Sequence, residues 1–321
     1  MTTPADQASS PAADDTQVAA CALCGHTGSH LVHEGARYAP DATIRSCAGC
    51  GLVFYWPRPS ASELAEYYAT EYRREYDAGV AVEAAYQDAI LEARARAARA
   101  RPLLTTRTRL LEVGASCGAF LEAVRPFVTA VTGVEPGHEH REWGRRHLDL
   151  EMVADAGVLR DRRFDVIAMF HTLEHLPDPV RDLRELAGLL AAGGHVVLEV
   201  PNVEDALATM YPTPAFLNFY YQRAHLYYFS PATLARTITA AGGKGTVTGL
   251  QRYDLSNHLR WLQTGAPGGH GHFSSVLTSE VNSAYAEALI RVGKSDTLWA
   301  VATFGGGSSG ARSLGVADHG F

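Results

Sequence analysis

The order of apolar and polar positions predicts strands and helices that alternate through the centre of the chain. Short apolar runs suited to buried strands occur near 109–113, 130–135, 149–153, 165–170 and 195–200. Helical periodicity fills most of the gaps, and two further apolar runs follow at 246–250 and 298–304. This alternation is typical of an α/β fold built on a mainly parallel sheet.

The composition of the remaining segments divides the chain into five regions. Small and polar residues dominate 1–20 and 306–321, which we expect to be disordered. A cysteine-containing module is expected over 21–60, a helical linker or lid over 61–105, and the main domain over 106–305. Within the main domain we expect substrate-covering insertions near 203–229 and 253–297.

Local sequence patterns refine these segments. Ser62 is expected to cap a helix, and Gly193–Gly194 to form the turn before the fifth strand. The stretch 203–223 is rich in aromatic residues and is predicted to be loop-like. The helix expected over 80–100 carries several arginines, including Arg96, which are predicted to lie on a solvated face.

Charge and length narrow the classes of function. The chain has 321 residues and a net charge of −7, which argues against broad binding to nucleic acid. It has no apolar run of about 18 residues and no basic-then-apolar leader, so we expect a cytoplasmic protein without membrane contact. A small-molecule partner and a monomeric or homodimeric state are expected.

Four of the five cysteines form two C-x-x-C pairs: Cys21, Cys24, Cys47 and Cys50. Each pair can direct two thiolates at one ion, and 22 residues separate the pairs, a spacing that predicts a structural Zn²⁺ site. Gly25 and Gly51 follow the pairs and suit turns with positive φ. The alternative is a redox pair of the thioredoxin type, which lacks its surrounding βαβ pattern here.

A glycine-rich turn follows the first predicted strand. Glu112-Val-Gly-Ala-Ser-Cys-Gly118 has neither the dinucleotide spacing G-x-G-x-x-G nor the P-loop spacing. No lysine follows to hold a phosphate, and Glu112 would repel one while accepting hydrogen bonds from a cation. The turn therefore favours a charged nucleoside without phosphates. Glu135, at the end of the next strand, is placed to reach ribose hydroxyls.

Four pieces in this order resemble the class I S-adenosylmethionine (SAM)-dependent methyltransferases. They are Glu112 to Gly118, Gly133-Val-Glu-Pro136, Phe164-Asp-Val-Ile and His171-Thr-Leu-Glu-His-Leu. The resemblance implies a Rossmann-like sheet with an antiparallel last strand, and SAM as cofactor. The SAM-binding residues that it implies are Tyr72, Glu112, Gly114, Ala115, Ser116, Gly118, Glu135, Pro136, Asp155, Ala156, Phe170 and His171.

The N-terminal part is similar to one subgroup of these enzymes, which carries a four-cysteine zinc module. The shared pattern is C-x-x-C-G-L-V-F-x-x-P-R-P-S followed by a tyrosine-rich helix. This subgroup includes deoxysugar C-methyltransferases of natural-product and antibiotic pathways. The likeness implies that Tyr68, Tyr72 or Tyr76 closes over the SAM and acceptor sites, although an aromatic packing stripe would give the same pattern.

Histidines near the expected ligand edge are candidates for a general base. His225 is the first candidate and His175 the second, while a structural hydrogen bond is the alternative role for each. Ala224 stands where the family has an acid, so the chain departs from the family's acid–histidine pair. We therefore expect O-methylation of a sugar, nucleotide-sugar or other natural product. C-methylation of a keto-deoxysugar and N-methylation are alternatives, with nucleic-acid or protein methylation less favoured.

Overall fold

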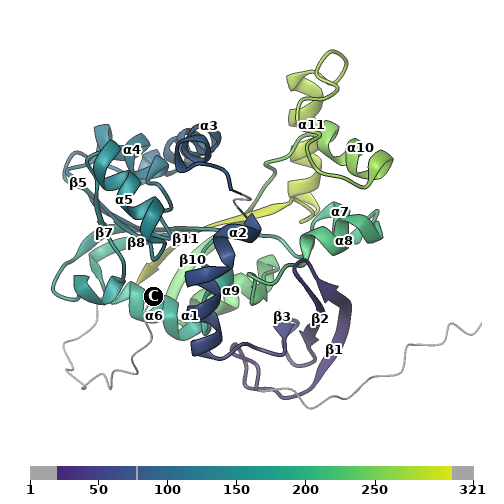
Figure 1. The fold of residues 1–321 in the computed structure, drawn as a ribbon, viewed down its shortest axis with the longest axis horizontal. Coiled ribbons are helices and arrows are strands. Elements are labelled where there is room, and N and C mark those ends of the chain that lie inside the picture. Colours follow the sequence, from purple (N-terminus) through teal and green to yellow (C-terminus); the bar gives the residue numbers. More distant parts are fainter. Residues whose placement is uncertain (1–19, 77–78, 306–321) are drawn as a thin grey trace, which may run out of the picture.

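The computed structural model describes residues 20–76 and 79–305, which fold around two β-sheets (Figure 1). The tails predicted to be disordered, 1–20 and 306–321, lie outside the described residues except for Ala20. Within the described ranges, no helix combines the length and the apolar character needed to cross a membrane.

The larger sheet has, within the described ranges, seven strands in the order β10-β11-β8-β7-β4-β5-β6. Their bounds are β4 Arg109–Val113, β5 Ala130–Val134, β6 Glu151–Val153, β7 Phe164–Phe170, β8 Leu190–Pro201, β10 Gly243–Leu250 and β11 Thr297–Phe304. Strands β4 to β8 pair in parallel, and β11 pairs antiparallel with β8 and β10. The predicted α/β sheet with an antiparallel last strand is confirmed. Its strand order reverses between β4 and β7, where open sheets of this type bind ligands.

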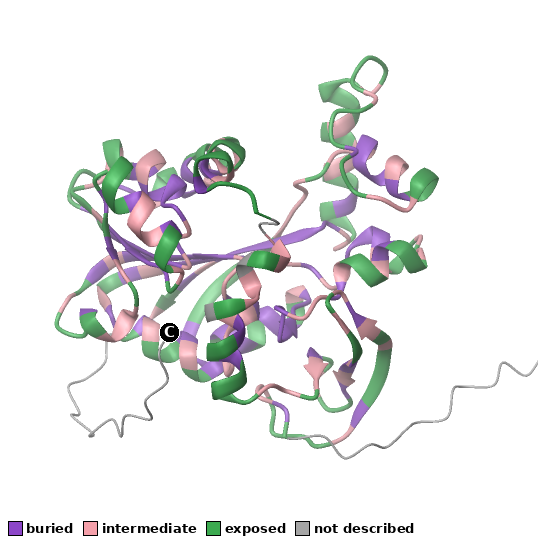
Figure 2. Ribbon diagram, viewed as in Figure 1, coloured by how far each residue is buried: buried purple, intermediate pink, exposed green. Residues whose placement is uncertain are grey.

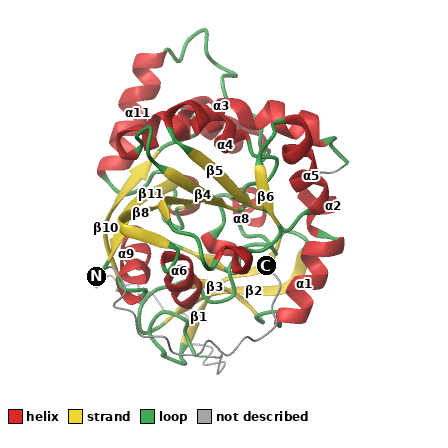
Figure 3. Ribbon diagram, turned by 90° about the vertical axis from the view of Figure 1, so that its left-hand side faces the viewer, coloured by secondary structure: helices red, strands yellow, loops and turns green. Residues whose placement is uncertain are grey.

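Helices cover both faces of this sheet (Figure 3). One face carries α3 Val82–Ala100, α4 Ala119–Val124 and α5 His138–His147, and the other carries α6 Pro179–Ala187 and α9 Pro231–Ala240. Single turns of 3-10 helix occur at η1 Arg101–Leu103, η2 Arg125–Phe127, η3 Ala156–Leu159 and η4 Leu173–His175. The layers are those expected when βα units alternate along the chain.

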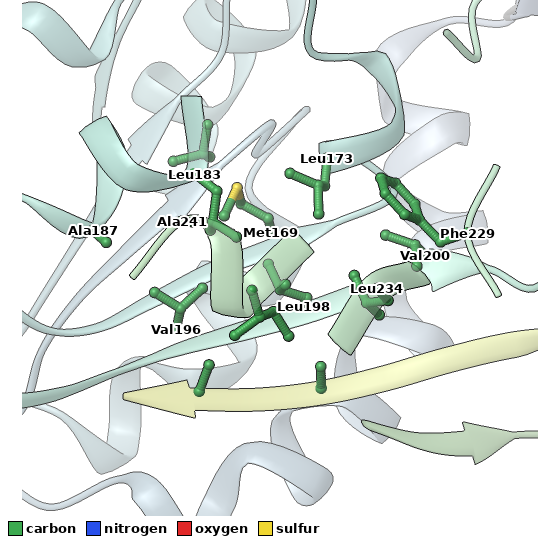
Figure 4. Packing of buried hydrophobic residues seen from close by; sticks show 14 of the residues in the cluster. Met169, Leu173, Leu183, Ala187, Val196, Leu198, Val200, Phe229, Leu234 and Ala241 are labelled. Carbon is green, nitrogen blue, oxygen red and sulfur yellow. The ribbon is translucent and has the colours of Figure 1, made fainter. Parts of the chain in front are cut away.

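The strands of the larger sheet are largely buried (Figure 2) because apolar side chains pack against both of their faces. Figure 4 shows one face, where Met169 of β7 and Leu198 of β8 meet Leu183 of α6 and Leu234 of α9. The same buried cluster continues into Phe54 and other apolar side chains of the N-terminal module. The module and the main domain therefore share one hydrophobic core.

The smaller sheet has the strand order β1-β2-β3-β9. Its strands are β1 Ser29–Ala36, β2 Ala39–Cys47, β3 Val53–Trp56 and β9 Tyr227–Tyr228, and the helices α1 Ala61–Thr70 and α2 Tyr72–Tyr76 follow β3 along the chain. Strand β9 comes from the insertion predicted near 203–229, yet its two tyrosines pair with Val53 and Phe54. The 21–60 module is thus completed by a segment from far along the chain.

Three local predictions were wrong. Gly193 and Gly194 lie inside β8, where the pairing with β7 is irregular between Phe164 and Val166, because glycine is tolerated at such bulges. The helix α1 is capped by Ser60, whose hydroxyl accepts from the Glu63 N–H in a capping box.

The aromatic stretch 203–223 is the third case, because it is partly helical instead of loop-like. It contains α7 Ala206–Thr209 and α8 Pro214–Tyr220, and the Thr213 hydroxyl caps α8. The second insertion holds α10 Leu255–Thr264 and α11 Ser279–Arg291. Figure 1 shows these last two helices projecting from the main body.

Candidate cofactor and acceptor site

A cavity of about 340 Å³ opens at the carboxyl ends of β4, β5 and β7. Its walls also include α3 and the tyrosine-bearing helices α1 and α2. Ligand pockets for small molecules commonly have volumes of roughly 300–1,000 Å³. The cavity therefore lies at the reversal of strand order and is large enough for a small-molecule ligand.

The glycine-rich turn forms one wall of the cavity. Its first position, Gly114, can be occupied only by glycine. Gly114 has φ +78°, and a Cβ there would lie 2.3 Å from the Thr172 Oγ1. That hydroxyl donates to the Val113 carbonyl at 3.0 Å, which ties the loop after β7 to the end of β4. The backbone thus bends sharply at Gly114 and leaves room for a ligand beside the turn.

Glu135 is held in a fixed position at the end of β5. Its Oε2 accepts from the Ser116 N–H at 2.9 Å, and its Oε1 accepts from the Gly137 N–H at 2.8 Å. The carboxylate is buried at the cavity wall, and each carboxylate oxygen can accept more than one hydrogen bond. This arrangement suits a ligand with paired hydroxyl donors, such as a ribose.

Glu112 is a buried acid without a full set of partners. Its Oε2 makes no hydrogen bond to any residue in the described part of the chain. Burial raises the pKa of the Glu112 carboxyl well above its ordinary value, and Glu135 adds to the rise while Arg96 opposes it. A cationic ligand in the cavity would satisfy the orphaned oxygen and favour the charged form of the acid.

The helix pattern predicted that Arg96 lies on a solvated face. This prediction was wrong, because Arg96 lines the cavity. Its Nη2 donates to the Glu199 Oε1 at 2.6 Å, and the guanidinium lies 4.8 Å from the Phe170 ring centre. Burial alone would raise the Glu199 pKa, but hydrogen bonds from His171 and Arg96 hold this pKa well below its usual range. Arg96 therefore brings a positive charge to the cavity wall, paired with a buried carboxylate.

His171 joins the same buried network. The Arg252 Nη1 lies 2.7 Å from the His171 Nε2, and the Glu199 Oε1 lies 3.2 Å from that nitrogen. Burial lowers the His171 pKa, but contacts with Glu174 and Glu199 raise it by more, so that its net pKa is above the ordinary value. The imidazole thus links the loop after β7 to the insertion that supplies Arg252.

A second histidine cluster lies beside the cavity. His175 lines the cavity and contacts the Tyr68 hydroxyl through its Nδ1 at 3.0 Å. His225 packs edge-on against His175, with ring centres 4.8 Å apart, and its Nε2 lies 3.9 Å from the Glu174 Oε1. Burial lowers the His225 pKa well below its ordinary value, and His175 and His171 add to this. The ring is therefore neutral at neutral pH, and the lowered pKa makes it a weaker proton acceptor than a solvated imidazole.

The four cysteines of the two C-x-x-C pairs lie together at one end of the small sheet, with all four sulfur atoms within 4.8 Å of one another. The Sγ atoms of Cys21 and Cys50 are 3.6 Å apart, as are those of Cys24 and Cys47. A tetrahedral zinc ion with Zn–S bonds of about 2.3 Å needs sulfur atoms about 3.8 Å apart. The donor set and its spacing fit a closed structural zinc site.

Most of the predicted SAM-binding residues line the cavity, and Tyr68, Arg96 and Thr172 line it as well. The predicted residues there are Tyr72, Glu112, Gly114, Ala115, Ser116, Glu135, Pro136, Phe170 and His171, together with His175. Four predicted residues are not part of its wall: Gly118, Asp155, Ala156 and His225.

The residues outside the wall have local roles in the fold. Gly118 begins α4 with φ +88°, and Asp155 caps η3 by accepting from the Gly157 N–H at 2.6 Å. Arg96 could not be found from the sequence, because helical periodicity alone does not show that its partner Glu199 ends a neighbouring strand. Thr172 lies within the His171-Thr-Leu-Glu-His-Leu piece, but the resemblance implied no role for it.

Comparisons with known proteins agree with this geometry. Residues 82–244 match the family model described as a methyltransferase domain. The ubiquinone biosynthesis O-methyltransferases of Vibrio vulnificus and Proteus mirabilis are 31% and 32% identical over 104 residues. That alignment covers 29% of this chain and 44% and 42% of the two enzymes, so the chain spans less than half the length of these curated relatives.

A solved structure shares the fold. It is a chain of the complex between the Haloferax volcanii Trm112 methyltransferase activator and a methyltransferase, with TM-score 0.50 and 16% identity. The superposition covers 74% of this chain and 99% of that one. Together with the family match over half of the sequence, the sheet order and the glycine-rich turn show that the chain belongs to the class I SAM-dependent methyltransferases.

Proposed function

We propose that this chain transfers the methyl group of SAM to a hydroxyl group of a small molecule. The observation that carries the proposal is the fixed carboxylate of Glu135 at the mouth of a cavity bounded by the glycine-rich turn. A ribose can donate both of its hydroxyls to this carboxylate. The amino group of the cofactor can satisfy the orphaned oxygen of Glu112.

The acceptor is proposed to be a sugar, a nucleotide-sugar or another natural-product intermediate. The similarity to O-methyltransferases supports oxygen as the methylated atom. In the reaction the acceptor oxygen attacks the methyl carbon, the C–S bond breaks and its electron pair stays on sulfur. The hydroxyl proton passes to an imidazole, with His225 as the first candidate and His175 as the second.

The four-cysteine cluster is proposed to hold one structural Zn²⁺ ion. Bound zinc would supply folding free energy to a module too small to build a large core of its own. Because β9 completes this module, the ion would also hold the insertion near 203–229 in place. Tyr227 and Tyr228 of that insertion are buried, and His225 precedes them by two residues.

Glu135→Ala is the variant that tests the proposed cofactor site. We expect it to weaken binding of S-adenosylhomocysteine (SAH) by about 1.5–3 kcal/mol, the range for hydrogen bonds to a charged group. The loss follows because the ribose hydroxyls would have no buried carboxylate to donate to. Titration calorimetry with SAH on the wild type and the variant measures it.

Glu139→Ala is the matched control, since Glu139 lies four residues further on and is exposed on α5. This control should bind SAH with the affinity of the wild type. Equal SAH affinity in Glu135→Ala and Glu139→Ala would contradict the assignment of the ribose site. Absence of SAH binding to the wild type would contradict the proposed cofactor.

A further inference from the structure

Glu174, His175 and His225 form a set of side chains that the zinc and SAM sites do not use. One candidate ligand atom from each of these residues lies within 4.8 Å of the other two. Glu174 and His225 are buried, and His175 is half-buried in the cavity wall. Two imidazoles and one carboxylate are the donor set of one class of catalytic transition-metal sites.

The state of Glu174 is the second observation that points to a cation. The residue is only 1% exposed, and neither carboxylate oxygen has a hydrogen-bond partner among the residues that the structure describes. The nearest nitrogens are the His171 Nδ1 at 3.3 Å and the His225 Nε2 at 3.9 Å from its Oε1. One His171 ring pairs with two buried carboxylates, Glu174 through its Nδ1 and Glu199 through its Nε2, and the Glu174 Oε2 has no hydrogen-bond partner in the described part of the chain.

The surrounding side chains are arranged as outer partners of metal ligands. The Tyr68 hydroxyl lies 3.0 Å from the His175 Nδ1, the kind of contact by which an outer partner orients a ligating imidazole. The Gln222 amide nitrogen lies 2.7 Å from the His225 Nε2 and 3.2 Å from its Nδ1, so binding of an ion at Nε2 requires this amide to turn.

We propose that Glu174, His175 and His225 bind a divalent first-row transition ion at the wall of the SAM cavity. Two imidazole nitrogens favour Mn²⁺, Fe²⁺, Co²⁺, Ni²⁺ or Zn²⁺ over Mg²⁺ and Ca²⁺, which take oxygen ligands. Three protein ligands leave coordination positions open toward the cavity, as in catalytic sites. An acceptor with two adjacent oxygen atoms, such as a vicinal diol or an α-hydroxy ketone, suits those positions.

This inference rests on the proposed methyl transfer and specifies how the acceptor loses its proton. An ion acting as a Lewis acid lowers the pKa of a coordinated hydroxyl, which releases its proton to water. The resulting oxygen then attacks the methyl carbon, while the C–S bond breaks and leaves its electron pair on sulfur. His175 and His225 would then act as ligands of the ion and not as the proton acceptor.

The test is a titration of the full chain with Co²⁺ after loading with one Zn²⁺ per chain. We expect one further Co²⁺ to bind, with an absorption spectrum that lacks the charge-transfer bands of cobalt–thiolate bonds. Glu174→Gln and His225→Ala should each weaken Co²⁺ binding by more than about 100-fold, and Tyr68→Phe by about 10-fold, since losing an outer partner costs about 10–100-fold. His147→Ala, at an exposed histidine on α5, should leave Co²⁺ binding unchanged.

Binding of only one metal ion per chain, or wild-type Co²⁺ affinity in both ligand variants, would overturn the inference. SAH titrations on the same samples show that each variant is folded. If the wild type binds SAH but no second ion, the metal site fails, while the proposed function stands with an imidazole as base. If Co²⁺ binds and SAH does not, the metal site is supported and the proposed cofactor fails.

Discussion

His225→Ala is expected to lower kcat by about 10²–10⁴-fold, the usual contribution of a positioned proton acceptor. His225 is buried beside the cavity, and its neighbours His175 and Glu174 belong to the loop that follows β7. SAH affinity should stay at the wild-type value, because His225 is not part of the cofactor cavity wall. Steady-state kinetics with the acceptor and calorimetry with SAH give the two measurements.

The loss of kcat is expected whether His225 takes the proton itself or holds a metal ion. Activity that depends on added Co²⁺ or Mn²⁺ in the wild type would identify the second case. His147→Ala is the control for the loss of a histidine outside the site. Wild-type kcat in His225→Ala would assign the base role to His175 or show that no base is needed.

Loss of the proposed zinc ion is expected to unfold the 21–60 module while the larger sheet keeps its fold. Structural zinc contributes roughly 10–16 kcal/mol of binding free energy in small modules, which is also folding free energy. Strand β9 would lose its partner β3, and the buried cluster around Phe54 would be exposed. Acceptor turnover should fall by about 10²-fold, the effect of misplacing reacting groups by about 1 Å.

Cys24→Ser separates this effect from any loss of a second ion, because it leaves Glu174, His175 and His225 unchanged. Hydrogen exchange should rise in residues 21–56 and 227–229 of the variant, with SAH affinity retained. Cys24 suits this role because it is the exposed member of the four cysteines. Full turnover in a zinc-free Cys24→Ser protein would exclude a role of the module in covering the acceptor.

Several features of the fold and site were readable from short stretches of sequence. The alternation of apolar strands and helices predicted the parallel sheet, and Gly114 marked the sharp turn that follows β4. These features rest on local chemistry, since glycine permits positive φ and short apolar runs are buried as strands. The C-x-x-C spacing likewise brought Cys21 and Cys24 together without reference to the rest of the chain.

Other features depended on residues that meet only in the folded chain. Arg96 has the pattern of a solvated helix face, but it lines the cavity and pairs with Glu199, which lies near the carboxyl end of β8. Gly193 was predicted to be part of a turn, yet it lies within a strand because irregular pairing with β7 accommodates it. Helical and strand periodicity describe one segment at a time and carry no information about such pairings.

The sheet, the glycine-rich turn, the cysteine pairs and the family could be predicted from the sequence alone. Each of them is encoded by residues that lie close together in short stretches of the chain. The pairing of β9 with the four-cysteine module, and the approach of Glu174 and His175 to His225, are visible only in the folded chain. The two partners of each contact lie at least about 50 residues apart. These residues approach one another because the two sheets pack against one shared hydrophobic core. Such packing depends on the whole folded chain and cannot be seen in any single segment.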